Sequence, residues 1–238
     1  MSMQSFKQYL TEAPDFASKA EKFADLKKLI SNCNATVLYS ESSKGLVIKN
    51  NIKLTDEVFF YAKLDEMPQG LISCERNFEY IDRATNLTSC KNFPKHVGGT
   101  FWLIAKTLTD LRGCPEEVDG EECFISGGFS SLEGITRYVN NGQMTITSPN
   151  LTSLKDIHKH ISFVEDRLDV NAPIRSNILG LLKIKGIRTL GLEVRNYPHY
   201  DECNEAFGII KKHLRRGRDI VACQRELIEN DLDEYAEL

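Results

Sequence analysis

The sequence has no long apolar run and none of the short motifs that mark common catalytic sites. No stretch approaches the roughly 20 consecutive apolar residues that span a bilayer, so we expect no membrane partner. The sequence lacks a Gly-rich phosphate-binding loop, a His-Glu-x-x-His zinc motif and paired Cys-x-x-Cys motifs. Gly127 and Gly128 are adjacent, but the Lys and Ser/Thr that a phosphate loop needs do not follow them. These absences predict a protein that is not an enzyme and that needs no cofactor and no metal.

The sequence also has no large excess of positive or negative charge. The chain has 30 Lys and Arg against 34 Asp and Glu, a net charge of −4, so we expect no nucleic-acid partner. Its seven cysteines are scattered, odd in number and without a secretory signal, which predicts free thiols in a reducing cytoplasm. Cys123 is a candidate for an exposed nucleophile, but the sequence places no histidine beside it. We therefore interpret the cysteines as small hydrophobic residues.

What the sequence does contain is a four-residue phrase that recurs at a nearly fixed interval. Its copies begin at residues 87, 108, 129 and 151, which are 21, 21 and 22 residues apart. Further apolar residues keep the same spacing after each copy. A period of this length is typical of solenoids, in which stacked units share one core. The four copies are Leu87–Cys90, Leu108–Leu111, Phe129–Leu132 and Leu151–Leu154.

We therefore predict an α+β fold built on a short solenoid of parallel β rungs with a different unit at each end. The repeats assign residues 69–175 to the solenoid. Residues 13–68 are predicted to form an N-terminal α+β cap, with a helix at 16–30 and a hairpin at 36–48. Residues 176–238 are predicted to form a mostly helical C-terminal cap.

The C-terminal cap is predicted in more detail. Ser176 is placed to start a helix that ends at Gly186. A last strand is expected at 189–194. Two further helices are expected at 201–216 and 219–237, and Asp219 is placed to cap the second.

The orientation of the strand residues follows from the alternation of side chains along a β-strand. Each extended stretch follows a glycine, which suits a tight turn because glycine accepts positive φ. The position that is apolar in every unit should point into the solenoid. The glycines are Gly99, Gly120 and Gly142, and the inward residues are Leu103, Phe124, Ile146 and Leu168.

The neighbours of the inward residues should then face solvent and form a candidate binding surface. On the first two rungs they are apolar, and tryptophan is enriched at binding hot spots. Two interpretations stay open: the N-terminal segment covers this patch as a cap, or a protein partner docks on it. The candidate partner-binding residues are Trp102, Ile104, Cys123, Ile125, Thr145 and Arg167.

A pair of histidines offers a metal site as a further hypothesis. His158 and His160 alternate along a segment that we interpret as extended, and Asp156 is near enough in sequence to be a third ligand. Histidines in a polar loop between rungs are more often solvated, so we predict no metal there.

The first 13 residues of the chain read MSMQSFKQYLTEA. This segment resembles the N-terminal capsid-targeting peptide of internal head proteins in T4-like bacteriophages, which the prohead protease cuts after a Leu/Ile-x-Glu triplet. Residues 10–12 match that triplet, so the resemblance implies cleavage between Glu12 and Ala13. A plain N-terminal helix is the other interpretation.

The repeats resemble leucine-rich-repeat-like proteins of large tailed phages. The resemblance depends on residues 108–120, on 158–161 and on the closing stretch 178–238, and it leaves 13–86 unassigned. It implies a phage protein with a short repeat platform and supplies no catalytic residue. Cys90 departs from the pattern, because it stands where the other copies of the phrase end in leucine.

Together these interpretations predict a non-enzymatic phage protein that binds a host or phage protein through the solenoid strand face in the host cytoplasm. Such a protein could inhibit a host defence enzyme or toxin by occlusion. One alternative is an internal head protein, packaged in the virion interior and delivered with the DNA. Another is an enzyme with a site between the N-terminal unit and the solenoid. The oligomeric state is not predicted.

Overall fold

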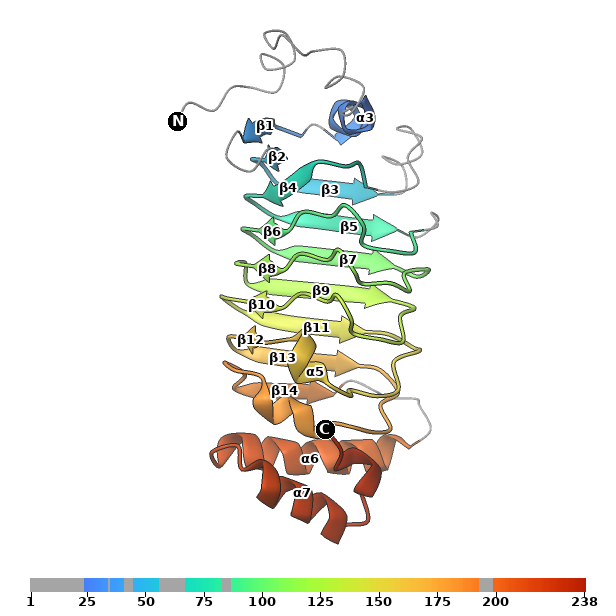
Figure 1. The fold of residues 1–238 in the computed structure, drawn as a ribbon, viewed down its shortest axis with the longest axis vertical. Helices are drawn as coiled ribbons and strands as arrows, with labels where there is room; N and C mark the ends of the chain where they lie inside the picture. Colours follow the sequence, from blue (N-terminus) through green and yellow to red (C-terminus); the bar gives the residue numbers. More distant parts are fainter. Residues whose placement is uncertain (1–23, 34, 41–44, 56–66, 83–86, 193–198) are drawn as a thin grey trace.

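The chain forms a parallel β-solenoid closed at its C-terminal end by helices (Figure 1). The computed structural model describes residues 24–33, 35–40, 45–55, 67–82, 87–192 and 199–238. Successive coils stack along the long axis of the molecule, with helix α3 (Ala24–Cys33) near one end and helices α6 (Tyr200–Arg215) and α7 (Ile220–Glu229) at the other.

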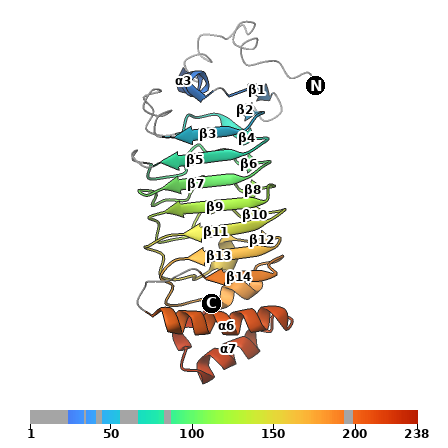
Figure 2. The ribbon, with the colours of Figure 1, turned by 180° about the vertical axis from the view of Figure 1, so that it is seen from behind.

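Successive coils each contribute one strand to both of two seven-stranded sheets, and each sheet has one further strand at one end. The sheet that we call the short-strand sheet has the order β1-β2-β4-β6-β8-β10-β12, and the long-strand sheet has the order β14-β13-β11-β9-β7-β5-β3 (Figure 2). All neighbours pair in parallel except β1 and β2, which form an antiparallel hairpin. The strands of the first sheet are β1 (Val37–Ser40), β2 (Gly45–Ile48), β4 (Leu71–Cys74), β6 (His96–Val97), β8 (Glu117–Val118), β10 (Tyr138–Val139) and β12 (Phe163–Val164). Those of the second are β3 (Ile52–Thr55), β5 (Phe78–Asp82), β7 (Phe101–Ala105), β9 (Glu122–Gly127), β11 (Gln143–Thr147), β13 (Arg167–Asn171) and β14 (Thr189–Leu192).

The core is a set of columns that run through the coils. In the short-strand sheet one inward column has valine in four successive coils, and each member is fully buried and paired with the next. β-Branched side chains fit this pleated, fully packed surface well. In the long-strand sheet a second inward column is equally buried. The first column is Val97, Val118, Val139 and Val164, and the second is Leu103, Ile125, Ile146 and Val170.

The predicted inward position is wrong by one residue in β9. Leu103 pairs with Ile125, and Ile125 pairs with Ile146, so Phe124 points outward. The reason is the turn between the two strands of a coil. Three residues separate Val97 from Phe101, but four separate Val118 from Cys123. Because strand side chains alternate, one extra residue exchanges the two faces.

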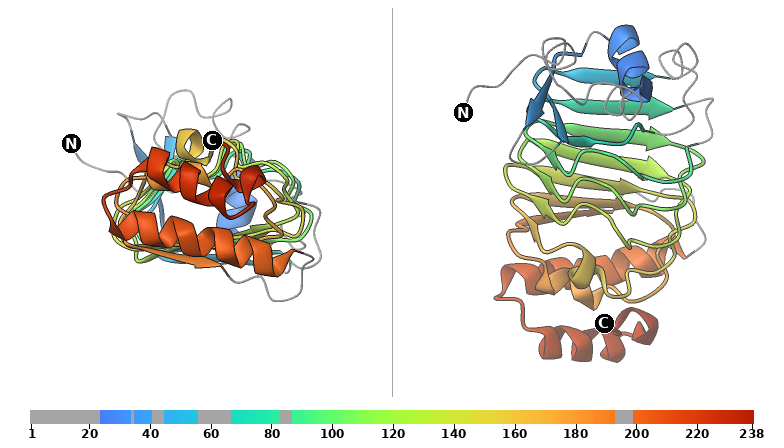
Figure 3. Two further views of the ribbon diagram at one scale, coloured as in Figure 1. Left: turned by 90° about the horizontal axis from the view of Figure 1, so that it is seen from below. Right: turned by 45° about the horizontal axis from the view of Figure 1, so that its top comes forward.

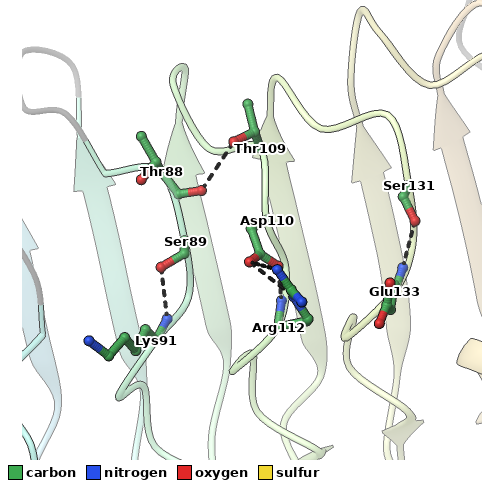
Figure 4. Close-up of polar contacts among 8 residues, drawn as sticks. All are labelled: Thr88, Ser89, Lys91, Thr109, Asp110, Arg112, Ser131 and Glu133. Carbon is green, nitrogen blue, oxygen red and sulfur yellow. Dashed lines mark hydrogen bonds and ion pairs between the residues drawn. The ribbon is translucent and has the colours of Figure 1, made fainter.

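The repeated phrase forms the third side of each coil. Its first and fourth residues are buried, and its third residue carries a polar side chain that accepts a hydrogen bond from the backbone N–H two residues further on (Figure 4). This local bond supports the turn in the way that Asx and Ser/Thr turns do. The acceptors are Ser89 Oγ from Lys91 N (3.4 Å), Asp110 Oδ1 from Arg112 N (2.9 Å), Ser131 Oγ from Glu133 N (3.2 Å) and Ser153 Oγ from Lys155 N (3.1 Å).

The turn residue after each phrase has a left-handed backbone conformation. Five residues after the phrase begins, φ is 64° at Asn92, 107° at Gly113, 83° at Gly134 and 58° at Asp156. Glycine, asparagine and aspartate are the residues that tolerate this region best. The glycines singled out from the sequence serve a different purpose. A Cβ on Gly120 would lie 2.2 Å from the carbonyl carbon of Gly99, so stacking of turn upon turn, not positive φ, requires glycine there.

The solenoid extends beyond the predicted range of 69–175. Strands β2 and β3 already belong to the two sheets, because β2 pairs with β4 and β3 pairs with β5. At the other end β14 adds to β13. The predicted hairpin in the N-terminal unit is confirmed by the pairing of β1 with β2, while the predicted helix is described only over α3.

The C-terminal cap covers the last coil (Figure 3). Helix α6, the predicted strand β14 and the start of α7 are confirmed, and Asp219 Oδ1 accepts a hydrogen bond from Ala222 N at 3.0 Å as the N-cap of α7. The predicted end of the last helix at residue 237 is wrong, because α7 ends at Glu229 and a turn separates it from the short 3-10 helix η2 (Asp233–Tyr235). The predicted helix from Ser176 to Gly186 is wrong in type and length. The segment contains a five-residue 3-10 helix, η1 (Leu179–Lys183), without a side-chain cap.

The cap is joined to the coil by an arginine and by backbone pairing. Arg218 donates from Nη2 to the carbonyl oxygen of Ile187 at 2.6 Å and from Nη1 to that of Ile184. The backbone of Ile178 donates to Tyr235 O at 3.2 Å, close to the 3-10 helix η2 (Asp233–Tyr235). These bonds satisfy backbone polar groups in the segments between the last coil and the helical cap.

The corrected register can be tested with two adjacent alanine substitutions. Ile125→Ala removes a fully buried side chain from the inward column and should lower the free energy of unfolding by about 2–5 kcal/mol. Phe124→Ala removes a half-buried outward side chain and should cost about 1 kcal/mol. Chemical denaturation of the two variants checks this, and the reverse order of losses would contradict the register.

Candidate functional site

The candidate surface is the outer face of the long-strand sheet, which Figure 2 shows as a stack of strands above the helical cap. Trp102 and Ile104 face outward from β7 and are half-buried, as predicted. Thr145 faces outward from β11, and Arg167 is exposed at the start of β13. These four predicted residues do lie on one face.

Two predicted members of the site do not belong to it. Cys123 and Ile125 are fully buried and point into the solenoid. The prediction placed them outside because it aligned β9 without the longer turn before it. The structure puts Phe124 on the outer face in their place.

The apolar centre of the face is formed by four side chains on three neighbouring strands, and we call it the aromatic patch: Ile81, Trp102, Ile104 and Phe124. Trp102 pairs with Phe124, and Ile81 pairs with Ile104. Sequence reasoning missed Ile81 and Phe124. The alternation from Phe78 to Ile81 and the extra residue before β9 are the features that could have found them.

Trp102 is held in a fixed orientation. Its Nε1–H donates to Glu122 Oε2 at 2.8 Å, and its ring centroid lies 6.0 Å from that of Phe124 at an interplanar angle of 48°. Gln143 Nε2 donates to the other carboxylate oxygen of Glu122 at 3.5 Å. Tilted aromatic pairs of this kind are favourable, and a side chain that is already ordered loses little entropy on binding.

Charged groups flank the aromatic patch at both ends of the sheet. Lys53 Nζ lies 2.9 Å from Glu79 Oε2 on one side, and Arg167 Nε lies 2.7 Å from Asp169 Oδ2 on the other. Such exposed pairs contribute little to stability. Their arrangement around an apolar centre matches the polar rim of a protein interface.

The described part of the N-terminal unit lies at one end of the solenoid and not over the aromatic patch. Helix α3 lies above β3 in Figure 1, while the patch is on β5, β7 and β9. The side chains of the patch are half-buried rather than fully covered. Residues 1–23 are outside the described residues, and so are Glu12 and Ala13, where cleavage was predicted.

The thiols lie in the core. Of the seven cysteines, six are buried and Cys33 is half-buried. Burial raises the pKa of the Cys123 thiol to about 12 and that of Cys74 to about 11. Cys114 Sγ donates to Cys90 Sγ of the preceding coil at 2.9 Å, and both fill inward positions.

The metal hypothesis fails on geometry. The segment after Asp156 is not extended but forms the four-residue helix α5 (Ile157–His160). Asp156 Oδ1 is paired with Lys159 Nζ at 2.8 Å. In the ranges that the structure describes, no group of three His, Cys, Asp or Glu side chains is placed to hold a metal ion.

No helix among the described residues is long and apolar enough to cross a bilayer. Protein-family models, curated proteins and solved structures were all compared with the chain, and none of them matches it.

The position of the thiols gives a prediction for alkylation. At pH 8 a thiol with a pKa of about 12 is ionised in only about one molecule in ten thousand, so native Cys123 should react very slowly with iodoacetamide. Its reactivity should rise with pH and on unfolding in urea. Peptide mass spectrometry of timed samples measures this, and rapid labelling of Cys123 in the folded protein at pH 8 would place it on the surface.

Proposed function

We propose that this chain is a binding protein without catalytic activity, which docks a protein partner on the outer face of the long-strand sheet. The observation that carries the proposal is the aromatic patch. The only tryptophan of the sequence stands there, oriented by Glu122 and Phe124, inside a rim of charged pairs. Tryptophan in a partly desolvated, ordered setting is the residue most typical of binding hot spots.

The size of the patch limits how it can act. Three strands of about five residues cover roughly 15 by 17 Å, which is well below the roughly 800 Å² per partner of a standard interface. A stable partner must therefore also cover the polar rows of β11 and β13. Thr145 and Thr147 face outward there, followed by Asp169. The aromatic patch would supply affinity, and the polar rows would supply specificity.

The biological setting of this proposal depends on the resemblance of residues 1–12 and 87–238 to phage proteins. In that setting the partner is a host or phage protein in the host cytoplasm, and occupation of its active surface would inhibit a defence enzyme or toxin. Packaging as an internal head protein is compatible with this role, because a packaged protein can act after delivery.

The proposal can be tested with charge substitutions on the patch. Trp102→Asp and Ile104→Asp should each weaken capture of a partner from infected-cell lysate by more than about tenfold, since each places an unpaired charge in a desolvated contact. Affinity purification with quantitative mass spectrometry measures the loss. Thr152→Asp adds the same charge on the third side of the coil and should leave capture unchanged.

Thermal unfolding of the same variants separates binding from folding. Because Trp102 and Ile104 are half-buried, their variants should keep a cooperative transition close to that of the wild-type protein. Equal capture by the wild-type and Trp102→Asp proteins would contradict the proposed site. If instead Thr152→Asp loses capture of the partner while it remains folded, the interface lies on the third side of the coil.

A further inference from the structure

A second site lies on the other sheet, where a cavity of about 590 Å³ opens beside β10, β12 and η1. Its polar lining residues come from the neighbouring coils that contain β10 and β12, and from the segment after β13 that includes η1. This volume is within the range of roughly 300–1,000 Å³ that is typical of small-molecule sites. The polar lining residues used below are Arg137, His158, Ser162, Lys183 and Lys185, and we call this site the basic pocket.

The basic pocket has three cations and no carboxylate among its lining residues. Within the described part of the chain, Arg137, Lys183 and Lys185 are in no ion pair. Three unneutralised cations around one cavity favour a ligand with more than one negative charge.

Arg137 is positioned by its neighbours. Its Nε–H donates to Ser162 Oγ at 2.8 Å, and its guanidinium carbon lies 5.6 Å from the centroid of the Tyr138 ring. These contacts use one face and one N–H of the guanidinium. The terminal N–H groups remain to bind oxygen atoms, which the fork of an arginine does well for phosphate.

Lys183 and Lys185 are placed beside the pocket by the backbone of the coil that follows β13. Lys185 forms a parallel bridge with Phe163, which pairs with Tyr138, so these three residues occupy one outward row. Lys185 N donates to Ser162 O at 3.1 Å, which fixes the backbone. Lys183 ends η1 two residues earlier.

Two glycines pack closely against residues that line the pocket. Gly186 has φ of +85°, and a Cβ there would lie 2.9 Å from Phe163 Cε2 and 2.3 Å from Val164 O. A Cβ on Gly180 would lie 3.1 Å from His158 Nδ1. That nitrogen is buried and has no hydrogen-bond partner among the residues that the structure describes, and burial together with the nearby Lys183 lowers the pKa of His158.

Two carboxylates of the next coil accept hydrogen bonds from Asn140, which also lines the pocket. Asn140 Nδ2 donates to Glu117 Oε1 at 2.6 Å and to Asp119 Oδ1 at 2.7 Å, and Asp119 Oδ2 is 2.8 Å from His96 Nε2. The bonds from Asn140 and His96 lower the pKa of Asp119. An anion would thus be drawn toward the end of the pocket that η1 forms.

We infer that the basic pocket binds a small phosphate monoester whose organic part packs against Tyr138 and Phe163. Inorganic phosphate alone would leave most of the cavity unfilled, whereas a ring attached to the phosphate can contact the aromatic walls. A nucleoside monophosphate has this chemistry, and AMP is the probe that we choose. The site is separate from the aromatic patch, so neither proposal depends on the other.

Isothermal titration calorimetry on the full chain tests the inference with AMP, inorganic phosphate and adenosine. AMP should bind most tightly, phosphate more weakly, and adenosine without measurable affinity. The Lys183→Gln/Lys185→Gln variant should bind AMP at least about tenfold more weakly, since each lost charge-assisted bond to phosphate costs about that factor. The matched control, Lys106→Gln/Lys155→Gln, removes two exposed lysines elsewhere and should bind as the wild-type protein does.

The outcomes distinguish the inference from general electrostatics. Absence of binding by both AMP and phosphate would overturn it. An equal loss in the control variant, or binding only of a long polyanion such as heparin, would overturn it in favour of a diffuse charge effect. Adenosine that binds as tightly as AMP would show that the cations do not contribute to binding, and it would also overturn the inference. Thermal unfolding of both double variants verifies that each is folded.

Discussion

The whole structure depends on the alignment of inward side chains from one coil to the next. Parallel hydrogen bonds place neighbouring strands about 4.8 Å apart, so each inward residue must fill the space left by those before and after it. Val97, Val118 and Val139 meet this condition with the same side chain in three coils. A slip of one residue would expose the entire column, because the period of a strand is two.

The turns between the strands adjust this alignment. The turn before β9 has one residue more than the turn before β7, and yet Leu103 of β7 still pairs with Ile125 of β9 in the inward column. Glycine makes the stacking of such turns possible: a Cβ on Gly142 would lie 2.0 Å from Glu121 O. Outside the columns the coil can vary in length without loss of the core, as the intervals between successive phrases already show.

Much of the fold could be predicted from the sequence. The recurring phrase predicted a solenoid because its first and fourth residues are buried in each of its four copies, and Asp219 predicted the start of α7 through ordinary capping. The short strands β6, β8, β10 and β12 were not predicted, since two residues carry too little periodicity. The coil that contains β2 and β3 was missed because the first copy of the phrase begins only at Leu87.

The candidate site was predicted less well than the fold. Trp102 and Ile104 were placed correctly, whereas Cys123 and Ile125 were exchanged with Phe124, because the alignment of the repeats did not take account of one extra turn residue before β9. The basic pocket could not be found from the sequence at all. Arg137 and Lys185 are 48 positions apart, and the coil that brings them together depends on the pairing of Phe163 with both neighbours.

Thiol cross-linking between β7 and β9 tests the alignment of the columns most directly. In a protein with Cys33→Ser, the pair Trp102→Cys and Phe124→Cys places two thiols on directly paired outward positions. A short bifunctional maleimide should join them rapidly in the folded protein. The single change Trp102→Cys, which leaves only the native Cys123 as a neighbour, should give no intramolecular link, because Cys123 is buried. Rapid linking to Cys123, with none to position 124, would contradict the register on which the core and the aromatic patch both depend.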